Sequence, residues 1–130
     1  MSNQGTKARI ENSLTVLLVT DLERSQAYYR DALGCDVNEW WAVRDDFGLG
    51  FKLLQAEDPQ DVRPNKNTWN TYAYVKTHGE LDVLYEELRG NGASIVQEAN
   101  TIEFDWGVWK EFSVQDPDGY VIGFGSGQKE

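Results

Sequence analysis

Residues able to carry covalent or metal chemistry are scarce in this chain of 130 residues. His78 is its only histidine and Cys35 its only cysteine. These counts exclude an intramolecular disulfide, a zinc site made of several cysteines, and any site that needs two histidines from one chain. They leave room for one Cys–His catalytic pair. We interpret His78 as a solvated residue at the start of a helix and Cys35 as a small buried residue.

The elements that would position a site follow an order that is repeated along the chain. Residues 14–19 form an apolar, β-favouring segment, and a capped helix with one apolar face follows it and ends at Gly34. Residues 72–75 begin the same order again, and a shift of 56 residues places Gly34 on Gly90 without a gap. Further strands are expected at 35–43, 48–55, 94–98 and 109–125, with an insertion near 100–108.

Two sequence motifs connect this plan to a known family. The first is V-T-D-L-E-R-S at residues 19–25, followed by Tyr28-Tyr29 and Leu33-Gly34. The second is F-S-V-Q-D-P-D-G-Y-V-I at residues 112–122. With the repeat, they resemble the vicinal oxygen chelate superfamily, the group of glyoxalases, bleomycin-resistance proteins and extradiol dioxygenases. The resemblance implies an α+β fold in which two βαβββ units form curved mixed sheets around a concave cleft, with the helices outside. The units are expected at about residues 10–56 and 68–126, joined by a polar linker.

A closer resemblance, to the bleomycin-resistance proteins, rests on N-T-W at residues 67–69 and W-G at residues 106–107. It implies an acidic, metal-free homodimer. In metal-dependent members of the superfamily, the resemblance places the ligands at the positions of Leu14, Thr71 and Gly123. None of these residues offers a carboxylate or an imidazole, and Thr71 offers only a hydroxyl. We therefore expect neither a metal nor another cofactor.

The same three positions set which strand residues face the cleft, because side chains alternate between the two faces of a strand. The alternation turns Trp109, Glu111 and Ser113 into the cleft from the second unit. It turns Trp40 and Lys52 into the cleft from the first unit, and Lys52 is expected to pair with Glu111. The same rule turns Ala42, Ala73 and Val75 inward and places Trp41, Tyr72 and Tyr74 in the core.

Trp69 and Trp106 are expected on loops at the rim of the cleft. A cleft with aromatic walls and few charges is typical of a site for a planar or cationic small molecule. The predicted ligand-binding residues are Trp40, Lys52, Trp69, Thr71, Trp106, Trp109, Glu111 and Ser113.

We predict a metal-free binding protein that sequesters an aromatic or cationic small molecule, such as an antibiotic, without changing it. One alternative is a lyase, isomerase or transferase in which Glu111 is the general acid or base. Another is a regulatory module whose tryptophans meet a protein partner. A ligand carboxylate would recruit Lys52, so the sequence leaves the charge of the ligand open.

Acidic residues outnumber basic residues, 22 to 12, and give a net charge of −10. This charge repels nucleic acids and anionic membranes. The longest apolar run, residues 16–19, is far shorter than the roughly 20 residues that cross a bilayer. Residues 1–10 contain no apolar region of a signal peptide. We expect a cytoplasmic protein with one domain over residues 1–130.

Overall fold

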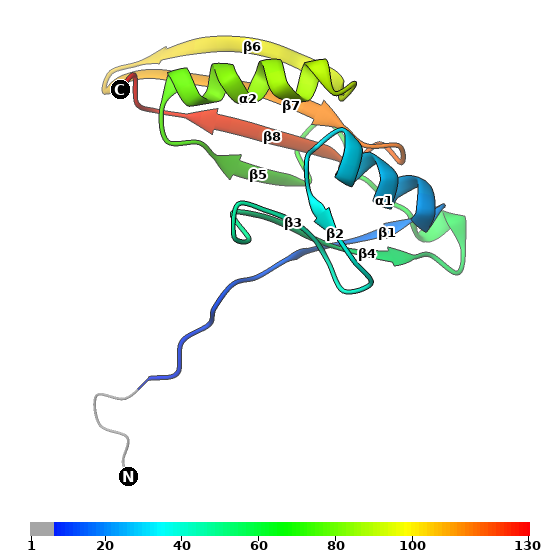
Figure 1. Ribbon diagram of the computed structural model, residues 1–130. Helices are drawn as coiled ribbons and strands as arrows, with labels where there is room; N and C mark the ends of the chain where they lie inside the picture. The colour runs from blue at the N-terminus through cyan, green and yellow to red at the C-terminus, as the bar shows by residue number, and fades with distance from the viewer. Residues whose placement is uncertain (1–6) are drawn as a thin grey trace.

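Two β-α-β-β-β units follow one another in the computed structural model, which describes residues 7–130 (Figure 1). The first unit contains β1 (Thr15–Val19), α1 (Leu22–Asp31), β2 (Asp36–Val37), β3 (Ala42–Arg44) and β4 (Leu49–Gln55). A short 3-10 helix, η1 (Pro59–Asp61), lies in the connecting segment. The second unit contains β5 (Thr71–Tyr74), α2 (His78–Gly90), β6 (Ser94–Phe104), β7 (Gly107–Gln115) and β8 (Val121–Ser126). The predicted α+β fold is confirmed. Part of the N-terminal segment interpreted as lacking a signal peptide, residues 1–6, lies outside the described residues.

Each unit forms its own four-stranded mixed sheet. The strand order is β1-β4-β3-β2 in the first sheet and β5-β8-β7-β6 in the second. In both sheets the strand before the helix pairs in parallel with the last strand of the unit, and the other neighbours are antiparallel. Figure 1 shows α2 lying along the second sheet and α1 lying beside the first. One face of each sheet therefore packs under helices, and we call the other its open face.

The helices begin where the sequence offers a capping side chain. The Asp21 carboxylate accepts the backbone N–H of Arg24 at 3.2 Å, and the Thr77 hydroxyl accepts the backbone N–H of Glu80 at 3.1 Å. These bonds satisfy backbone donors that the first helical turn leaves free. Gly34, with a φ of 72°, then turns the chain from α1 towards β2. Among the described residues, neither helix has the length and apolar character needed to cross a membrane.

Hydrogen bonds and a shared core hold the two units together. Thr15 and Thr71 are equivalent under the 56-residue shift, and their hydroxyl oxygens lie 3.1 Å apart, so β1 and β5 meet at equivalent positions. Tyr29 of α1 donates its hydroxyl hydrogen to the Asp116 carboxylate of the second unit at 2.8 Å. Apolar side chains from both units form one cluster between the sheets and the helices.

The facing predicted for β5 is wrong by one residue. Thr71 lies beside the fully buried Ile122 in the strand register, and Tyr72 lies beside Gly123. Neighbours in register share a face of the sheet. The corrected assignment places Thr71, Ala73 and Val75 on the core face of the second sheet, and Tyr72 and Tyr74 on its open face.

Two assignments in the first unit are also wrong. Ala42 lies beside Phe51 in the register, and both side chains are fully buried in the core. Trp41 is 36% exposed and packs edge-on against Phe47, with 5.1 Å between the ring centroids. Ala42 therefore faces the core, and Trp41 lies outside it.

Two expected strand boundaries change as well. The Asn38 side chain accepts the backbone N–H groups of Trp40 and Trp41, at 2.7 and 3.0 Å. This turn divides the strand expected at 35–43 into β2 and β3. The insertion expected near 100–108 is incorporated into the two strands of the β6–β7 hairpin and lengthens it.

The hydroxyl of Ser25 on α1 is fully buried and has no hydrogen-bond partner among the described residues. An unsatisfied buried hydroxyl costs stability, and alanine is the better helix former. We expect Ser25→Ala to raise the free energy of unfolding by about 1 kcal/mol. Urea denaturation followed by circular dichroism measures the change, and a lower midpoint in the variant would contradict the prediction.

Candidate functional site

An aromatic groove of about 590 Å³ lies on the open face of the second sheet. Its walls come from β5, β6 and β7, from the loop before β5, and from the turn between β6 and β7. All but one of its uncharged lining residues are aromatic, and its one charged residue is Glu111. The lining residues are Trp69, Tyr72, Tyr74, Ile102, Phe104, Trp106, Trp109 and Glu111.

Three alternate glycines, two in β8 and one directly after it, leave space for the aromatic rings of the groove. A Cβ atom on Gly123 would lie 2.5 Å from the indole of Trp69, and one on Gly125 would overlap Trp109. A Cβ atom on Gly127 would lie 3.1 Å from the same Trp109 ring. Because the glycines have no side chains, the rings lie directly against the strand. We call Gly123, Gly125 and Gly127 the glycine track.

The aromatic rings also pack against one another along the groove. Trp106 stacks on Phe104 with an interplanar angle of 7° and meets Trp109 edge-on. Trp109 in turn stacks on Tyr72 and meets Tyr74 at 90°. Such offset and edge-to-face pairs stabilise the rings beyond the burial of their area. The rings of the groove walls therefore support one another by direct packing.

Glu111 lies at the base of the groove and is 7% exposed. Its Oε1 atom accepts the Tyr72 hydroxyl at 2.7 Å and the Trp109 indole N–H at 3.0 Å. Its Oε2 atom accepts the amide of Gln97 at 2.9 Å. Burial and the hydrogen bond to Glu111 raise the pKa of Tyr72, so its hydroxyl stays protonated and keeps donating.

A second chain of hydrogen bonds extends this network to the rim. The Trp69 indole N–H donates to the Ser113 hydroxyl at 2.9 Å. Ser113 donates to the side-chain oxygen of Gln97 at 2.8 Å, while the amide nitrogen of Gln97 holds Glu111. Each polar atom in this chain has a partner, so the ring of Trp69 and the carboxylate of Glu111 are fixed in orientation.

The other predicted site residues lie away from the groove. Lys52, on the first sheet, donates to the backbone carbonyl of Trp40 at 3.2 Å, and its Nζ atom lies 5.7 Å from the centroid of the Trp40 ring. The expected pair of Lys52 with Glu111 is wrong, since the ion pairs of the described residues do not include it. Thr71 faces the core.

The structure thus brings together five of the eight predicted residues. Their ligand-binding role stays a prediction. The five are Trp69, Trp106, Trp109, Glu111 and Ser113. Missing from the prediction were Tyr72, Tyr74, Gln97, Ile102 and Phe104. The repeat identifies Tyr72 as an open-face residue. The 56-residue shift superposes Tyr72 on Val16, which lies on the open face of the first sheet beside Lys52.

The side chains at the superfamily's ligand positions do not fit a divalent metal. The side chain of Leu14 fills the space above Gly50, and the ring of Trp69 covers Gly123. Tyr72, rather than Thr71, stands beside Gly123 on the open face. Among residues 7–130, no three histidine, cysteine, aspartate or glutamate side chains lie close enough to share an ion. These positions therefore offer no ligand set for a divalent metal.

The single histidine and the single cysteine both lie outside the groove. His78 is the first residue of α2, as predicted, but it is half-buried, and its Nε2 atom lies 3.1 Å from the carbonyl oxygen of Val108. Cys35 is buried, and burial raises the pKa of its thiol to about 12. A thiol with this pKa is inert at neutral pH.

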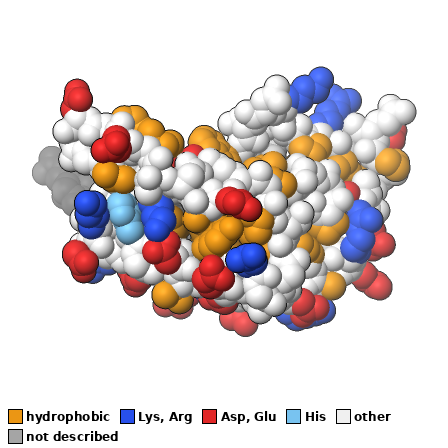
Figure 2. All heavy atoms as spheres, turned by 90° about the horizontal axis from the view of Figure 1, so that it is seen from above, with side chains coloured by type: hydrophobic (Ala, Val, Ile, Leu, Met, Phe, Trp, Pro, Cys, Tyr) orange, Lys and Arg blue, Asp and Glu red, His pale blue; other side chains and the backbone are white. Residues whose placement is uncertain are grey.

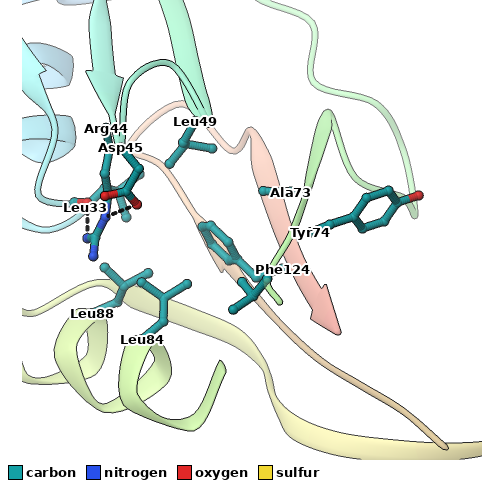
Figure 3. A pocket seen from close by; sticks show the side chains of 11 residues that line it. Leu33, Arg44, Asp45, Leu49, Ala73, Tyr74, Leu84, Leu88 and Phe124 are labelled. Atoms are coloured by element: carbon teal, nitrogen blue, oxygen red, sulfur yellow. Dashed lines mark hydrogen bonds and ion pairs between the residues drawn. The ribbon is translucent and has the colours of Figure 1, made fainter. Parts of the chain in front are cut away.

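A smaller cavity of about 150 Å³ lies between the two units (Figure 3). Leu84 and Leu88 of α2 and Phe124 of β8 line its apolar interior. Arg44 stands at its edge and forms two hydrogen bonds with Glu87, at 2.6 and 2.7 Å. This ion pair joins β3 of the first unit to α2 of the second. Its arginine is therefore engaged within the protein.

The net charge of −10 is not concentrated on the face shown in Figure 2. Acidic and basic side chains are mixed there, with hydrophobic side chains between them. Several ion pairs link charges of opposite sign, among them Lys110 with Asp82 and Arg24 with Asp118. On that face the surface charge does not mark out a separate site.

Comparisons with known proteins agree with this fold. The profile of the Glyoxalase/Bleomycin resistance protein/Dioxygenase superfamily matches residues 13–124. A protein of Haemophilus influenzae named lactoylglutathione lyase is 28% identical over 121 residues, which cover 85% of this chain and 87% of the relative.

Solved structures share the fold at lower identity. A glyoxalase/bleomycin resistance protein/dioxygenase from Alicyclobacillus acidocaldarius is 16% identical, with a TM-score of 0.65, and the match covers 92% of this chain and 95% of that one. A protein of the same description from Nocardioides is 19% identical, with a TM-score of 0.62, and the match covers 96% and 88%. On the strength of the profile, which spans both units, the chain belongs to the glyoxalase/bleomycin resistance protein/dioxygenase superfamily.

Proposed function

We propose that this protein binds an aromatic or cationic small molecule in the aromatic groove and holds it without changing it. The observation that carries the proposal is the groove itself, whose walls are almost wholly aromatic and whose one charged residue is a carboxylate. Aromatic faces bind planar rings by stacking and bind cations through the negative charge of the ring face. An antibiotic held in the cytoplasm is one such ligand, and sequestering it would confer resistance.

The arrangement of Glu111 favours binding over acid–base catalysis. A general base must reach a substrate proton with a free lone pair. Here Tyr72, Trp109 and Gln97 already donate to its two oxygens, which leaves about one of the four lone-pair positions for a substrate proton. The curated relative's name nevertheless makes a lyase the second candidate, and lactoylglutathione is the compound to offer.

We also propose that the protein acts as a homodimer, which is supported by apolar side chains left uncovered on both open faces. Val16 on the first sheet is 56% exposed, and Tyr74 and Trp106 at the groove are 81% and 62% exposed. Apolar surface of this extent marks interaction sites in soluble proteins. The alternative occupant of these open faces is a different protein. Sedimentation equilibrium of the purified protein separates the two, because a monomer would count against the homodimer.

Isothermal titration calorimetry tests the proposed function with two probes, 9-aminoacridine and a bleomycin-type glycopeptide. We expect saturable binding of at least one probe and its recovery unchanged by mass spectrometry. Trp109→Ala removes a stacking surface and is expected to weaken binding at least about tenfold. Val83→Ala, on the exposed side of α2, is the control and should bind like the natural protein.

Two results would contradict the proposal. One is the lack of saturable binding by both probes. The other is turnover of lactoylglutathione by the natural protein and its loss in Glu111→Gln, which would establish the enzymatic alternative.

A further inference from the structure

We propose that the aromatic groove is selective for a quaternary ammonium group, held over Glu111 by the surrounding rings. This inference rests on the proposed function and narrows its ligand to one chemical class. It is carried by three observations: the carboxylate has no cationic partner, its hydrogen-bonding capacity is nearly used up, and the walls around it are aromatic.

The negative charge of Glu111 is not balanced by a cation among the described residues. Lys110, its neighbour in β7, pairs with Asp82 on α2, and Lys52 is held by the carbonyl of Trp40 on the other sheet. The ion pairs of residues 7–130 include none to Glu111. A carboxylate that is 7% exposed and faces a groove is therefore left with its charge open to a ligand.

The hydrogen bonds of Glu111 decide which kind of cation fits. A carboxylate has about four lone-pair positions, and Tyr72, Trp109 and Gln97 direct donors to them. A primary ammonium brings three N–H donors and would leave most of them without an acceptor in the groove. A quaternary ammonium brings a positive charge and no donor, so it loses no hydrogen bond on entering.

The aromatic walls supply the rest of the site. Tyr74 and Trp106 each meet Trp109 edge-to-face, and Phe104 stacks on Trp106. All four rings line the same groove as Glu111. The methyl groups of a quaternary ammonium carry its positive charge and make apolar contacts with such rings. The same groove thus offers charge attraction and apolar burial to one compact head group.

Three related probes test the selectivity on the natural protein: benzyltrimethylammonium, benzylammonium and benzyl alcohol. They share a benzyl group and differ in charge and in N–H or O–H donors. By calorimetry we expect benzyltrimethylammonium to bind at least about tenfold more tightly than each of the other two. Equal affinity for benzyltrimethylammonium and benzyl alcohol, or tighter binding of benzylammonium, would overturn the inference.

Two variants that each remove one negative charge show which residue produces the selectivity. Glu111→Gln should abolish the preference for benzyltrimethylammonium over benzyl alcohol. Glu103→Gln, an exposed residue of β6, should keep it. A preference that survives in Glu111→Gln, or that disappears equally in both variants, would show that general surface charge produces it. The natural protein's ranking of the three probes decides the question even if Glu111→Gln does not fold.

Failure of this inference is distinguishable from failure of the proposed function. If 9-aminoacridine or the glycopeptide binds and benzyltrimethylammonium has no advantage, the groove is a binding site without quaternary ammonium selectivity. If none of the five probes binds, the binding function itself is wrong.

Discussion

Asp116→Ala is expected to lower the free energy of unfolding by about 3–4 kcal/mol. The Asp116 carboxylate is buried and accepts the Tyr29 hydroxyl at 2.8 Å and the backbone N–H groups of Asp118 and Tyr120 at 2.9 Å each. Alanine would leave all three donors without this acceptor, and the Tyr29 hydroxyl is fully buried. Loss of the bond also removes one of the contacts that join α1 to the second unit. Urea denaturation measures the change, and a loss below about 1 kcal/mol would contradict it.

Asp116→Asn is the matched control, and comparison with it isolates the pH dependence of stability that Asp116 causes. Burial, the largest influence, raises the pKa of Asp116 above its ordinary value of 3.8. The folded protein therefore binds this proton more tightly than the unfolded chain, and the natural protein loses stability as the pH rises from about 3.8 through the raised pKa. Asparagine keeps an acceptor and does not titrate. The stability of the natural protein relative to Asp116→Asn should fall across this range, and a rise would contradict the assignment.

Gly125→Ala is expected to damage both stability and ligand binding. A Cβ atom on Gly125 would overlap the Tyr72 hydroxyl and the indole of Trp109, two of the groups that hold Glu111. Overpacking of this kind costs about 1–3 kcal/mol. Displaced rings would also open the groove, so we expect probe affinity in calorimetry to fall at least about tenfold.

Gly90→Ala is the control for this substitution. Gly90 is the last residue of α2, and apart from its chain neighbours and the adjacent helix backbone no atom lies within 4 Å of the position a Cβ would take. Alanine in a helix is more stable than glycine by up to about 1 kcal/mol. Gly90→Ala should therefore be neutral or stabilising and should bind the probes normally. Equal effects of the two substitutions on binding would show that the glycine track does not shape the groove.

The fold was predictable because each unit repeats the same local signals. A short apolar strand, a capping residue and one apolar helix face occur in the same order 56 residues apart. The shift does not hold at the helix ends, where the glycines with a positive φ are Gly34 and Gly92 rather than Gly34 and Gly90. The break between β2 and β3 was not predictable from hydrophobicity, because it depends on the Asn38 side chain, which binds two backbone N–H groups among aromatic residues.

The site was predictable in part. The face of β7 was predicted correctly. Trp109 and Glu111 line the groove, and Ser113 bonds to Trp69 on its wall. The face of β5 was wrong because it was taken from the superfamily's ligand position at Thr71 instead of from the repeat. The bond of Gln97 to Glu111 was beyond prediction, since the register of β6 against β7 shifts on both sides of Gln97.

The meeting of Gly123 and Trp69 bears on how such a protein could change its chemistry over evolution. The resemblance places a carboxylate ligand of metal-dependent relatives at the position of Gly123, which the Trp69 ring now covers. A glutamate introduced there alone would collide with the indole, and removal of the indole alone would take away the ring that packs on Gly123 and supply no ligand. Either substitution alone is therefore expected to harm the protein, and the two together would supply one ligand only, because Leu14 and Thr71 offer neither a carboxylate nor an imidazole, so a metal site here requires at least three coordinated changes.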